Sequence, residues 1–503
     1  MDNFLAIILT AHVPYLRTIG HHPHGADTLH ETIAFALIPT INVLSDLRDA
    51  GMQAPVGLAI SPILLEQLAD PTVQKHFLSW MEEWLEVRTD ALARWERQGG
   101  AHASYLARFY VDWGRSIVRS FTERYNRDIP SALRKLCAGL AEPLSGAASH
   151  AYLPMLQHPG SRHAQIHTGL MTTAQHLGRM PDGVWLPECG FDPRLMPALR
   201  SSEMRYVIAD PSSVGELNLH QRPHWAVPGR LQVLVRDVAA AELVWSTDLG
   251  YPGDPVYRSP KRDPRSGMEL WRNGMSNTPI DLYDPYDAYR RAAEHASHFL
   301  SSVGASLSVA DAGYDRPGVA VVPINLELLG RRWFEGPIWL RAVLERAMRG
   351  EGPALAAPIE YLRAYRSRQT VGLRDGSWGP GGDHRAWSSV EANILQEHIA
   401  QAERRMATIA QAFPRAEGTQ ERALNQALRE LLLAQSSDWL FLAGQGLLEE
   451  AQRRVDLHLT RFHQLCDMAA DPAVAEYSHQ IAEIEELDNP FPQLNYRIFI
   501  EQE

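Results

Sequence analysis

Seven short apolar runs, separated by longer stretches with helical spacing, constrain the fold of this chain more than any other feature. Each run is continuous rather than alternating, which indicates strands buried on both faces of a parallel sheet. The stretches between them, such as 32–50, supply the crossover helices that parallel strands need. The sequence therefore predicts an α/β fold, a seven-stranded (β/α)7 barrel of the TIM type that is incomplete by one strand. The runs are Phe4–Leu9, Val56–Ser61, Ala138–Leu144, Gly183–Glu188, Tyr206–Ala209, Leu231–Arg236 and Val319–Ile324.

Two regions depart from this alternation of strands and helices. The charged stretch at about residues 70–130 is too long for one crossover helix, so we expect a helical insertion there. After residue 340 the strand signals stop and amphipathic stretches follow, which predicts a barrel domain over 1–340 and an all-α domain over 341–503. The Gly-rich segment Arg374–Trp387 is predicted to be a loop, and loops on a rigid scaffold tend to carry function.

The composition of the chain narrows the classes of function. The 503 residues carry a formal net charge of −12, with 60 acidic against 48 basic side chains. This balance argues against nucleic acid or an anionic membrane as a partner, because phosphate groups are bound by clustered Lys and Arg. Three widely spaced cysteines form no metal-binding pattern and no disulfide framework. We also find no basic leader and no apolar run near the ~20 residues of a membrane helix, and we expect a cytoplasmic protein.

Residues that could carry chemistry follow several runs at their carboxyl ends, where parallel α/β barrels place their active sites. His12 follows the first run, His150 follows the third, Glu188 ends the fourth and Asn325 follows the last. Retaining glycosidases need two carboxyl groups about 5–5.5 Å apart, and Glu188 is a candidate for one of them. Two alternatives stay open on the residues alone: Glu188 could pair with an Arg, and His12 could be a hydrogen-bonded core residue.

Tryptophan is as frequent as phenylalanine, at 13 residues each, although it is usually the rarer of the two. Trp245, Trp378 and Trp387 are either packing residues or flat faces on which sugar rings stack. The Gly-rich loop that carries Trp378 and Trp387 favours contact with a ligand. Three histidines within residues 21–24 lie in a Gly/Pro-containing segment without a fourth ligand, so we expect no metal site.

Several long segments together resemble the α-1,4-glucan branching enzymes of glycoside hydrolase family 57, and the likeness spans nearly the whole chain. The segments are LTAHVPYLR (9–17), SPILLEQLAD (61–70), WLPECGF (185–191), VWSTDLGYPG (244–253), DGSWGPGGDHRAW (375–387), SSDWLF (436–441) and DNPFP (488–492). The resemblance implies a seven-stranded barrel with a helical insertion and a helical C-terminal domain. It also implies a retaining mechanism on α-glucan, such as amylose or glycogen, without a metal or organic cofactor.

The resemblance further implies roles for individual residues. Glu188 corresponds to the family's catalytic nucleophile, and His12 and His150 correspond to histidines that line the sugar site. The positions that bind glucan in the family correspond to Arg236, Trp245, Gly253, Trp378 and Asp438, with Trp387 nearby.

The chain departs from the family at the second catalytic carboxyl group. The family's acid/base is an Asp in a motif of the form PYDAELFGHWW, whereas this chain has PINLELLGRRW with Asn325 at that position. An amide has no proton to give at neutral pH, and general acid catalysis contributes about 10²–10⁴-fold, so the substitution predicts weak or absent turnover. Arg331 and Arg332 replace His-Trp and would change the charge of the cleft if they face it. Glu327 has either a structural role or the role of the missing acid.

Other departures concern the rest of the site. Thr10 stands where the family has a His, and Leu447 stands near a glucan-binding Gln. The segment between Tyr206 and Trp245 looks shortened and contains no tyrosine, whereas the family's branching enzymes have there a Tyr associated with transfer rather than hydrolysis. Three functions stay open: a branching enzyme of weak or no activity, a non-catalytic glucan-binding homologue, and an α-glucan hydrolase of altered specificity.

Overall fold

The computed structural model describes residues 3–17, 25–215, 224–226, 231–264, 266–274, 282–310, 316–367 and 370–500. Each of the seven predicted runs forms a strand, and neighbouring strands among these seven are parallel. They are β1 (Phe4–Ala11), β2 (Val56–Ile60), β3 (Ala141–Ser145), β4 (Gly183–Trp185), β5 (Tyr206–Ala209), β7 (Gln232–Val235) and β8 (Val319–Asn325). Their order in the sheet is β7-β5-β4-β3-β2-β1-β8.

Among the described residues, the two ends of this order meet at one bridge. Arg236, directly after β7, pairs with Val321 of β8, and the backbone N–H of Asp237 donates to the Val321 carbonyl at 2.7 Å. One bridge stands where a complete barrel would have a further strand. The predicted incomplete barrel of the TIM type is therefore confirmed.

Three very short strands, which were not predicted from the sequence, extend the sheet. β6 (His224–Ala226) runs antiparallel to β7, β10 (Thr370–Val371) pairs with β6, and β9 (Ala354–Leu355) pairs with β1. Two or three residues are too few to form a recognisable apolar run. Sheet pairing thus continues beyond residue 340, and the division of the chain into domains at that residue stays a prediction.

Most of the predicted strands begin or end one or two residues away from their observed limits, and two differ by three residues at one end. The third begins at Ala141 rather than Ala138, because a turn separates it from the end of α6 at Cys137. The fourth ends at Trp185 rather than Glu188, because Pro187 has no N–H for a strand ladder and the backbone of Glu188 is left-handed, with a φ of +57°. Glu188 therefore lies in a turn beyond the strand end.

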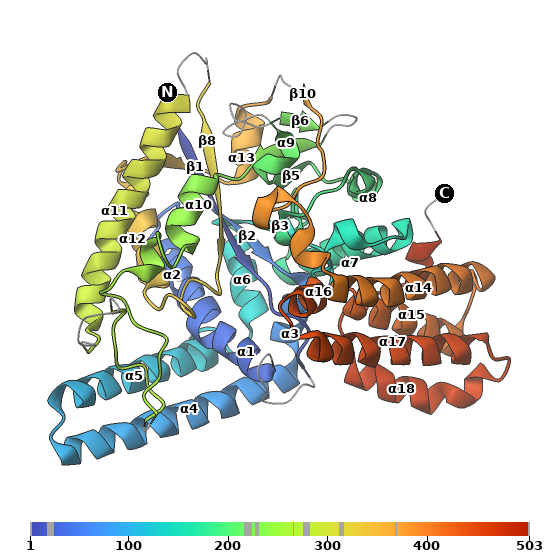
Figure 1. Ribbon diagram of the computed structural model, residues 1–503, viewed down its shortest axis with the longest axis horizontal. Helices are drawn as coiled ribbons and strands as arrows, with labels where there is room; N and C mark the ends of the chain where they lie inside the picture. The colour runs from blue at the N-terminus through green and yellow to red at the C-terminus, as the bar shows by residue number, and fades with distance from the viewer. Residues whose placement is uncertain are drawn as a thin grey trace.

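Helices surround the barrel (Figure 1). They are α1 (Ala26–Glu31), α2 (Ile38–Asp49), α3 (Pro62–Ala69), α6 (Ile129–Cys137), α7 (Pro159–Leu177), α8 (Met196–Ser201), α9 (Pro211–Val214), α10 (Val238–Trp245), α11 (Pro285–Ala310), α12 (Gly336–Met348) and α13 (Pro358–Ala364). None of the helices in the described part of the chain is long and apolar enough to cross a membrane.

The insertion forms a hairpin of two long helices, α4 (Pro71–Gln98) and α5 (Ala101–Arg119), which extends along the lower left of Figure 1. Asp70 caps the start of α4 through its carboxylate, and Gly99 ends the helix in the left-handed conformation. Trp113 of α5 stacks on Phe35, which lies between α1 and α2, with 4.7 Å between ring centroids. This contact is one of those that fasten the hairpin to the barrel.

The C-terminal helices pack together at the right of Figure 1. They are α14 (Val390–Ala412), α15 (Gly418–Ala434), α16 (Ser437–Gly444), α17 (Leu448–Ala470) and α18 (Ser478–Leu487). α16 is short and lies against the barrel, where the Ser437 N–H donates to the His150 carbonyl at 3.2 Å. The first turn of α16 therefore lies at the carboxyl end of the barrel strands.

Candidate active site

A cavity of about 730 Å³ lies at the carboxyl ends of the barrel strands, and α16 contributes to its wall. It brings together nearly all the residues predicted from the sequence. Those that line it are His12, His150, Glu188, Arg236, Trp245, Asn325, Trp378, Trp387 and Asp438. Gly253 is not among the described lining residues.

Glu188 is held in the cavity with 24% of its side chain exposed. The Trp378 backbone N–H donates to the Glu188 carbonyl at 3.2 Å, and the Trp378 indole Nε1–H donates to Glu188 Oε2 at 2.7 Å. Oε1 lies 4.0 Å from His150 Nδ1. The left-handed backbone of Glu188 costs energy, and the two hydrogen bonds from Trp378 help to offset that cost. The carboxylate is thus kept in one orientation, as a nucleophile requires.

Two histidines and one aspartate form a wall of the cavity. The rings of His12 and His150 stack, with centroids 3.8 Å apart and planes at 7°. His12 Nε2 donates to Asp438 Oδ2 at 2.8 Å, and His12 Nδ1 lies 2.9 Å from the Ser61 hydroxyl. Asp438 comes from the first turn of α16. The C-terminal helices therefore complete a site that begins on the barrel.

Aromatic rings form a further wall beside Glu188. Trp378 meets Trp245 and Trp185 edge-on, with ring centroids 4.9 and 5.2 Å apart. Trp245, at the end of α10, keeps 39% of its surface exposed, whereas Trp387 keeps 3% and stacks on Tyr152 at 4.1 Å. Trp245 thus has the exposed face that sugar stacking needs, and Trp387 is mainly a packing residue at the cavity edge.

Arg236 is oriented by a residue that the sequence analysis missed. Its Nε donates to Asp210 Oδ2 at 2.5 Å, and Asp210 directly follows β5. A carboxylate at a strand end is the signal that identified the other candidates, so this one could have been found. Gly253 has a structural reason to be glycine, because a Cβ there would lie 1.9 Å from the Thr247 carbonyl oxygen.

The segment after β8 places another carboxylate in the cavity, besides Glu188 and Asp438. Asn325 ends the strand, and its Oδ1 accepts a hydrogen bond from the Glu327 backbone N–H at 2.8 Å. The Glu327 side chain lines the cavity, and Arg331 and Arg332 line it too. Arg331 Nη1 lies 3.7 Å from Glu327 Oε2, and Arg331 Nε donates to Glu31 at 2.9 Å. The two arginines thus face the cleft, and Arg331 is paired with acids.

The acids of the cavity have shifted pKa values. Burial raises the pKa of Glu188 to about 7, while the hydrogen bond from Trp378 acts in the opposite direction. Burial also raises the pKa of Glu327. At Asp438 burial acts in the same direction, but the charge and hydrogen bond of His12 outweigh it and lower the pKa to about 2. Asp438 is therefore ionised at neutral pH. The pKa of Glu188 lies near neutral pH, and that of Glu327 is shifted upward.

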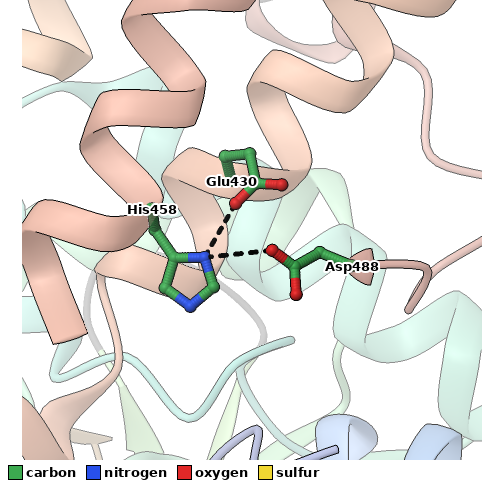
Figure 2. A group of neighbouring side chains, drawn as sticks. All are labelled: Glu430, His458 and Asp488. Atoms are coloured by element: carbon green, nitrogen blue, oxygen red, sulfur yellow. Dashed lines mark hydrogen bonds and ion pairs between the residues drawn. The ribbon is translucent and has the colours of Figure 1, made fainter. Parts of the chain in front are cut away.

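One group of side chains in the described part of the chain has the spacing of a metal site, and it lies in the C-terminal helical region. Figure 2 shows Glu430, His458 and Asp488, whose ligand atoms lie within 4.8 Å of one another. His458 Nδ1 lies 2.7 Å from Glu430 and 3.6 Å from Asp488, and Arg461 donates to Asp488. Because the guanidinium already supplies positive charge, we interpret the group as a buried ion-pair network. The three histidines within 21–24 lie outside the described residues.

Comparisons with known proteins match the chain along most of its length. The family model described as glycosyl hydrolase family 57 matches residues 6–370, and the one described as 1,4-α-glucan branching enzyme, C-terminal, matches residues 398–499. A 1,4-α-glucan branching enzyme of Thermococcus kodakarensis is 32% identical over 532 residues, which cover 98% of this chain and 78% of that protein.

Solved structures agree with these matches. The chain is similar to a branching enzyme of Pyrococcus horikoshii, with a TM-score of 0.92 at 30% identity over 100% of this chain and 98% of that one. It is also similar to an α-amylase of Thermotoga maritima, with a TM-score of 0.88 at 26% identity over 100% of both chains. Because one fold serves a branching enzyme and an amylase, the fold alone does not separate transfer from hydrolysis.

Proposed function

The chain belongs to glycosyl hydrolase family 57, and from this premise we propose that it transfers segments of α-1,4-glucan to the 6-hydroxyl group of an acceptor glucan. The observation that carries the proposal is the position of Glu188, a carboxylate fixed by the Trp378 indole in a cavity at the carboxyl ends of the barrel strands. Trp245 offers an exposed aromatic face beside it, on which a glucose ring can stack.

Glu188 is the nucleophile in this proposal. One carboxylate oxygen attacks the anomeric carbon, the bond from that carbon to the glycosidic oxygen breaks, and the departing oxygen takes up a proton. The glucan segment is then held on Glu188 as a glycosyl ester. The acceptor 6-hydroxyl attacks the same carbon and loses its proton, the ester bond breaks, and an α-1,6 branch has formed with net retention of configuration.

Fixed polar groups around Glu188 suit the hydroxyl groups of a neutral glucan. Asp438 is ionised, and its Oδ2 accepts from His12 and from the Ser436 hydroxyl, so this carboxylate is a hydrogen-bond acceptor held at a constant position. Arg236 is held by Asp210 in the same way. Hydrogen-bonding groups that are already oriented bind a ligand at a lower entropic cost than mobile ones.

Glucan binding without turnover is a second candidate, and Asn325 favours it. This residue ends β8 and has no proton to donate at neutral pH, and its side-chain oxygen already accepts from the Glu327 N–H. Hydrolysis is a third candidate, favoured by the lack of tyrosine between Tyr206 and Trp245. Of that segment, 216–223 and 227–230 lie outside the described residues.

The purified protein incubated with amylose distinguishes the three functions. New α-1,6 linkages, counted as chains released by a debranching enzyme, are expected for the wild type and not for Glu188→Gln, with amylose binding retained in both. Reducing ends without new branches would instead establish hydrolysis. No change in amylose, with binding retained, would establish a glucan-binding protein and contradict the proposed transfer.

A further inference from the structure

A retaining mechanism needs a second carboxyl group that gives a proton to the leaving oxygen, about 5–5.5 Å from the nucleophile. Four carboxylates line the cavity in the part of the chain that the structure describes. They are Glu188, Glu242, Glu327 and Asp438. With Glu188 assigned as the nucleophile, three candidates for the acid remain.

Two of these three candidates are unsuitable as proton donors. Asp438 Oδ2 accepts hydrogen bonds from His12 Nε2 at 2.8 Å and from the Ser436 hydroxyl at 2.7 Å. These bonds stabilise the ionised form and keep its pKa near 2, so it holds no proton at neutral pH. Glu242 lies on α10 and is exposed, so the cavity walls do not hold its side chain in the fixed position that proton transfer to a leaving oxygen needs.

Glu327 has the properties that the other two lack. Its side chain is 25% exposed and lines the cavity, two residues after the end of β8. Burial favours its protonated form and raises its pKa, although the charges of Arg331, His12 and Arg332 oppose this and that of Asp438 adds to it. A negative charge on Glu327 also raises the pKa of Glu188, so the two carboxyl groups are electrostatically coupled across the cavity.

Asn325 is not itself a proton donor, but it holds the backbone of Glu327 in place. The Asn325 side-chain oxygen accepts from the Glu327 backbone N–H, and the Leu328 N–H donates to the Asn325 backbone carbonyl at 3.1 Å. These bonds close a tight turn directly after the strand. The turn fixes the backbone from which the Glu327 side chain projects, so Asn325 is a positioning residue.

We propose that Glu327 is the catalytic acid and base of this site, in place of a carboxylate at position 325. In the first step Glu327 gives its proton to the glycosidic oxygen, Glu188 bonds to the anomeric carbon, and the bond between that carbon and the glycosidic oxygen breaks. In the second step the Glu327 carboxylate takes the proton of the acceptor hydroxyl, that oxygen bonds to the anomeric carbon, and Glu188 is released. Glu327 ends each cycle protonated, as it began. The assignment rests on the proposed function, because it needs a glycosyl transfer to catalyse.

Two substrates that differ in leaving group test this assignment. Amylose requires a proton on its leaving oxygen, whereas the fluoride of α-maltosyl fluoride departs without one. For Glu327→Gln we expect branching of amylose to fall about 10²–10⁴-fold, while the initial burst of fluoride stays within about tenfold of wild type. Azide needs no general base, so it should accelerate fluoride turnover by Glu327→Gln and yield α-maltosyl azide.

The matched control is Glu31→Gln. Glu31 pairs with the same Arg331 as Glu327 does, at a shorter distance, and is not among the described lining residues. If Glu327 served only to hold Arg331, both variants would lose activity to a similar degree on both substrates. We expect Glu31→Gln to keep its branching activity within a few-fold of wild type and to show no response to azide.

The remaining outcomes separate this assignment from the proposed function. Wild-type branching that is abolished by Glu188→Gln but kept by Glu327→Gln would overturn the assignment and leave the function standing. An equal loss on amylose and on the fluoride burst would also overturn it. A wild-type protein inactive on both substrates would overturn both.

Discussion

The carboxylate of Glu188 depends on a single neighbouring side chain for its orientation and for part of its acidity. The Trp378 indole donates to this carboxylate, while the Trp378 backbone N–H donates to the Glu188 main-chain carbonyl. The indole hydrogen bond lowers a pKa that burial raises. A nucleophile must be ionised to attack, so activity is expected to fall as the pH drops below about 7. Desolvation and this hydrogen bond are the two largest influences on the pKa of Glu188, and the charges of Asp438, His12 and Glu327 add smaller ones.

Trp378→Phe tests the influence of this hydrogen bond. Phenylalanine keeps a ring next to Trp245 but removes the N–H that favours the ionised form of Glu188. The pKa of Glu188 should rise, so the acidic limb of kcat/KM moves to higher pH and activity at pH 6 falls more than activity at pH 8. Trp245→Phe is the comparison: it should weaken glucan binding without moving the limb. Limbs that coincide in both variants would contradict the assigned role of the indole.

Single residues were predictable where they follow a strand directly, and less so elsewhere. His12 and Glu188 come at strand ends, and this position alone suggested a site. Asp438 was implied only by the resemblance, because it lies in a helical region with no strand to mark it. The orientation of Glu327 depends on a hydrogen bond from its own backbone to Asn325, which the residue pattern does not reveal.

At the scale of elements, the helical hairpin of α4 and α5 shows how close packing selects a residue. A Cβ on Gly114 of α5 would lie 2.6 Å from Trp84 Cζ3 of α4, which is closer than two carbon atoms approach. The two helices can therefore pack at this distance only with glycine in that position. Glycine in the middle of a helix otherwise lowers the stability of that helix relative to alanine.

Gly114→Ala should lower the free energy of unfolding by about 1–3 kcal/mol, because the added methyl group forces the two helices apart. Chemical denaturation measures this change. Gly100→Ala is the control in the same hairpin, since its nearest neighbour would be Trp95 Cδ1 at 3.6 Å, an ordinary contact. Equal effects of the two substitutions would contradict the packing explanation.

At the scale of the whole molecule, the barrel and the C-terminal helices share one buried acid. Glu403 of α14 is 1% exposed, and its Oε2 accepts from the backbone N–H groups of Gln157 and His158 at 3.0 and 2.9 Å. Its Oε1 accepts from Gln435 Nε2 at 3.0 Å. Gln157 and His158 lie directly before α7, and Gln435 lies just before α16. The network therefore connects the start of α7 in the barrel to the helix that carries Asp438.

Glu403→Ala should therefore affect both stability and activity. It removes the acceptor of three hydrogen bonds, and each donor that water cannot reach then costs about 1–3 kcal/mol. We expect a lower unfolding midpoint in chemical denaturation and a slower branching reaction, since the support of α16 is loosened. Glu403→Gln keeps an oxygen acceptor and should recover part of both losses. An alanine variant with wild-type stability and slower branching would show that the network does not hold the two parts together.

Local sequence patterns were enough to predict the seven longer strands of this protein and the part of the site that lies on strand ends. A continuous apolar run indicates a strand that is buried on both faces. Because such a run can be recognised within a few consecutive residues, all seven strands were predictable. The tertiary structure decided what depends on contacts between distant residues. These are the bridge between Arg236 and Val321, and the hydrogen bond between His12 and Asp438 across 426 positions of the chain. Periodicity measures which side of an element is buried, and only packing decides which element lies against it.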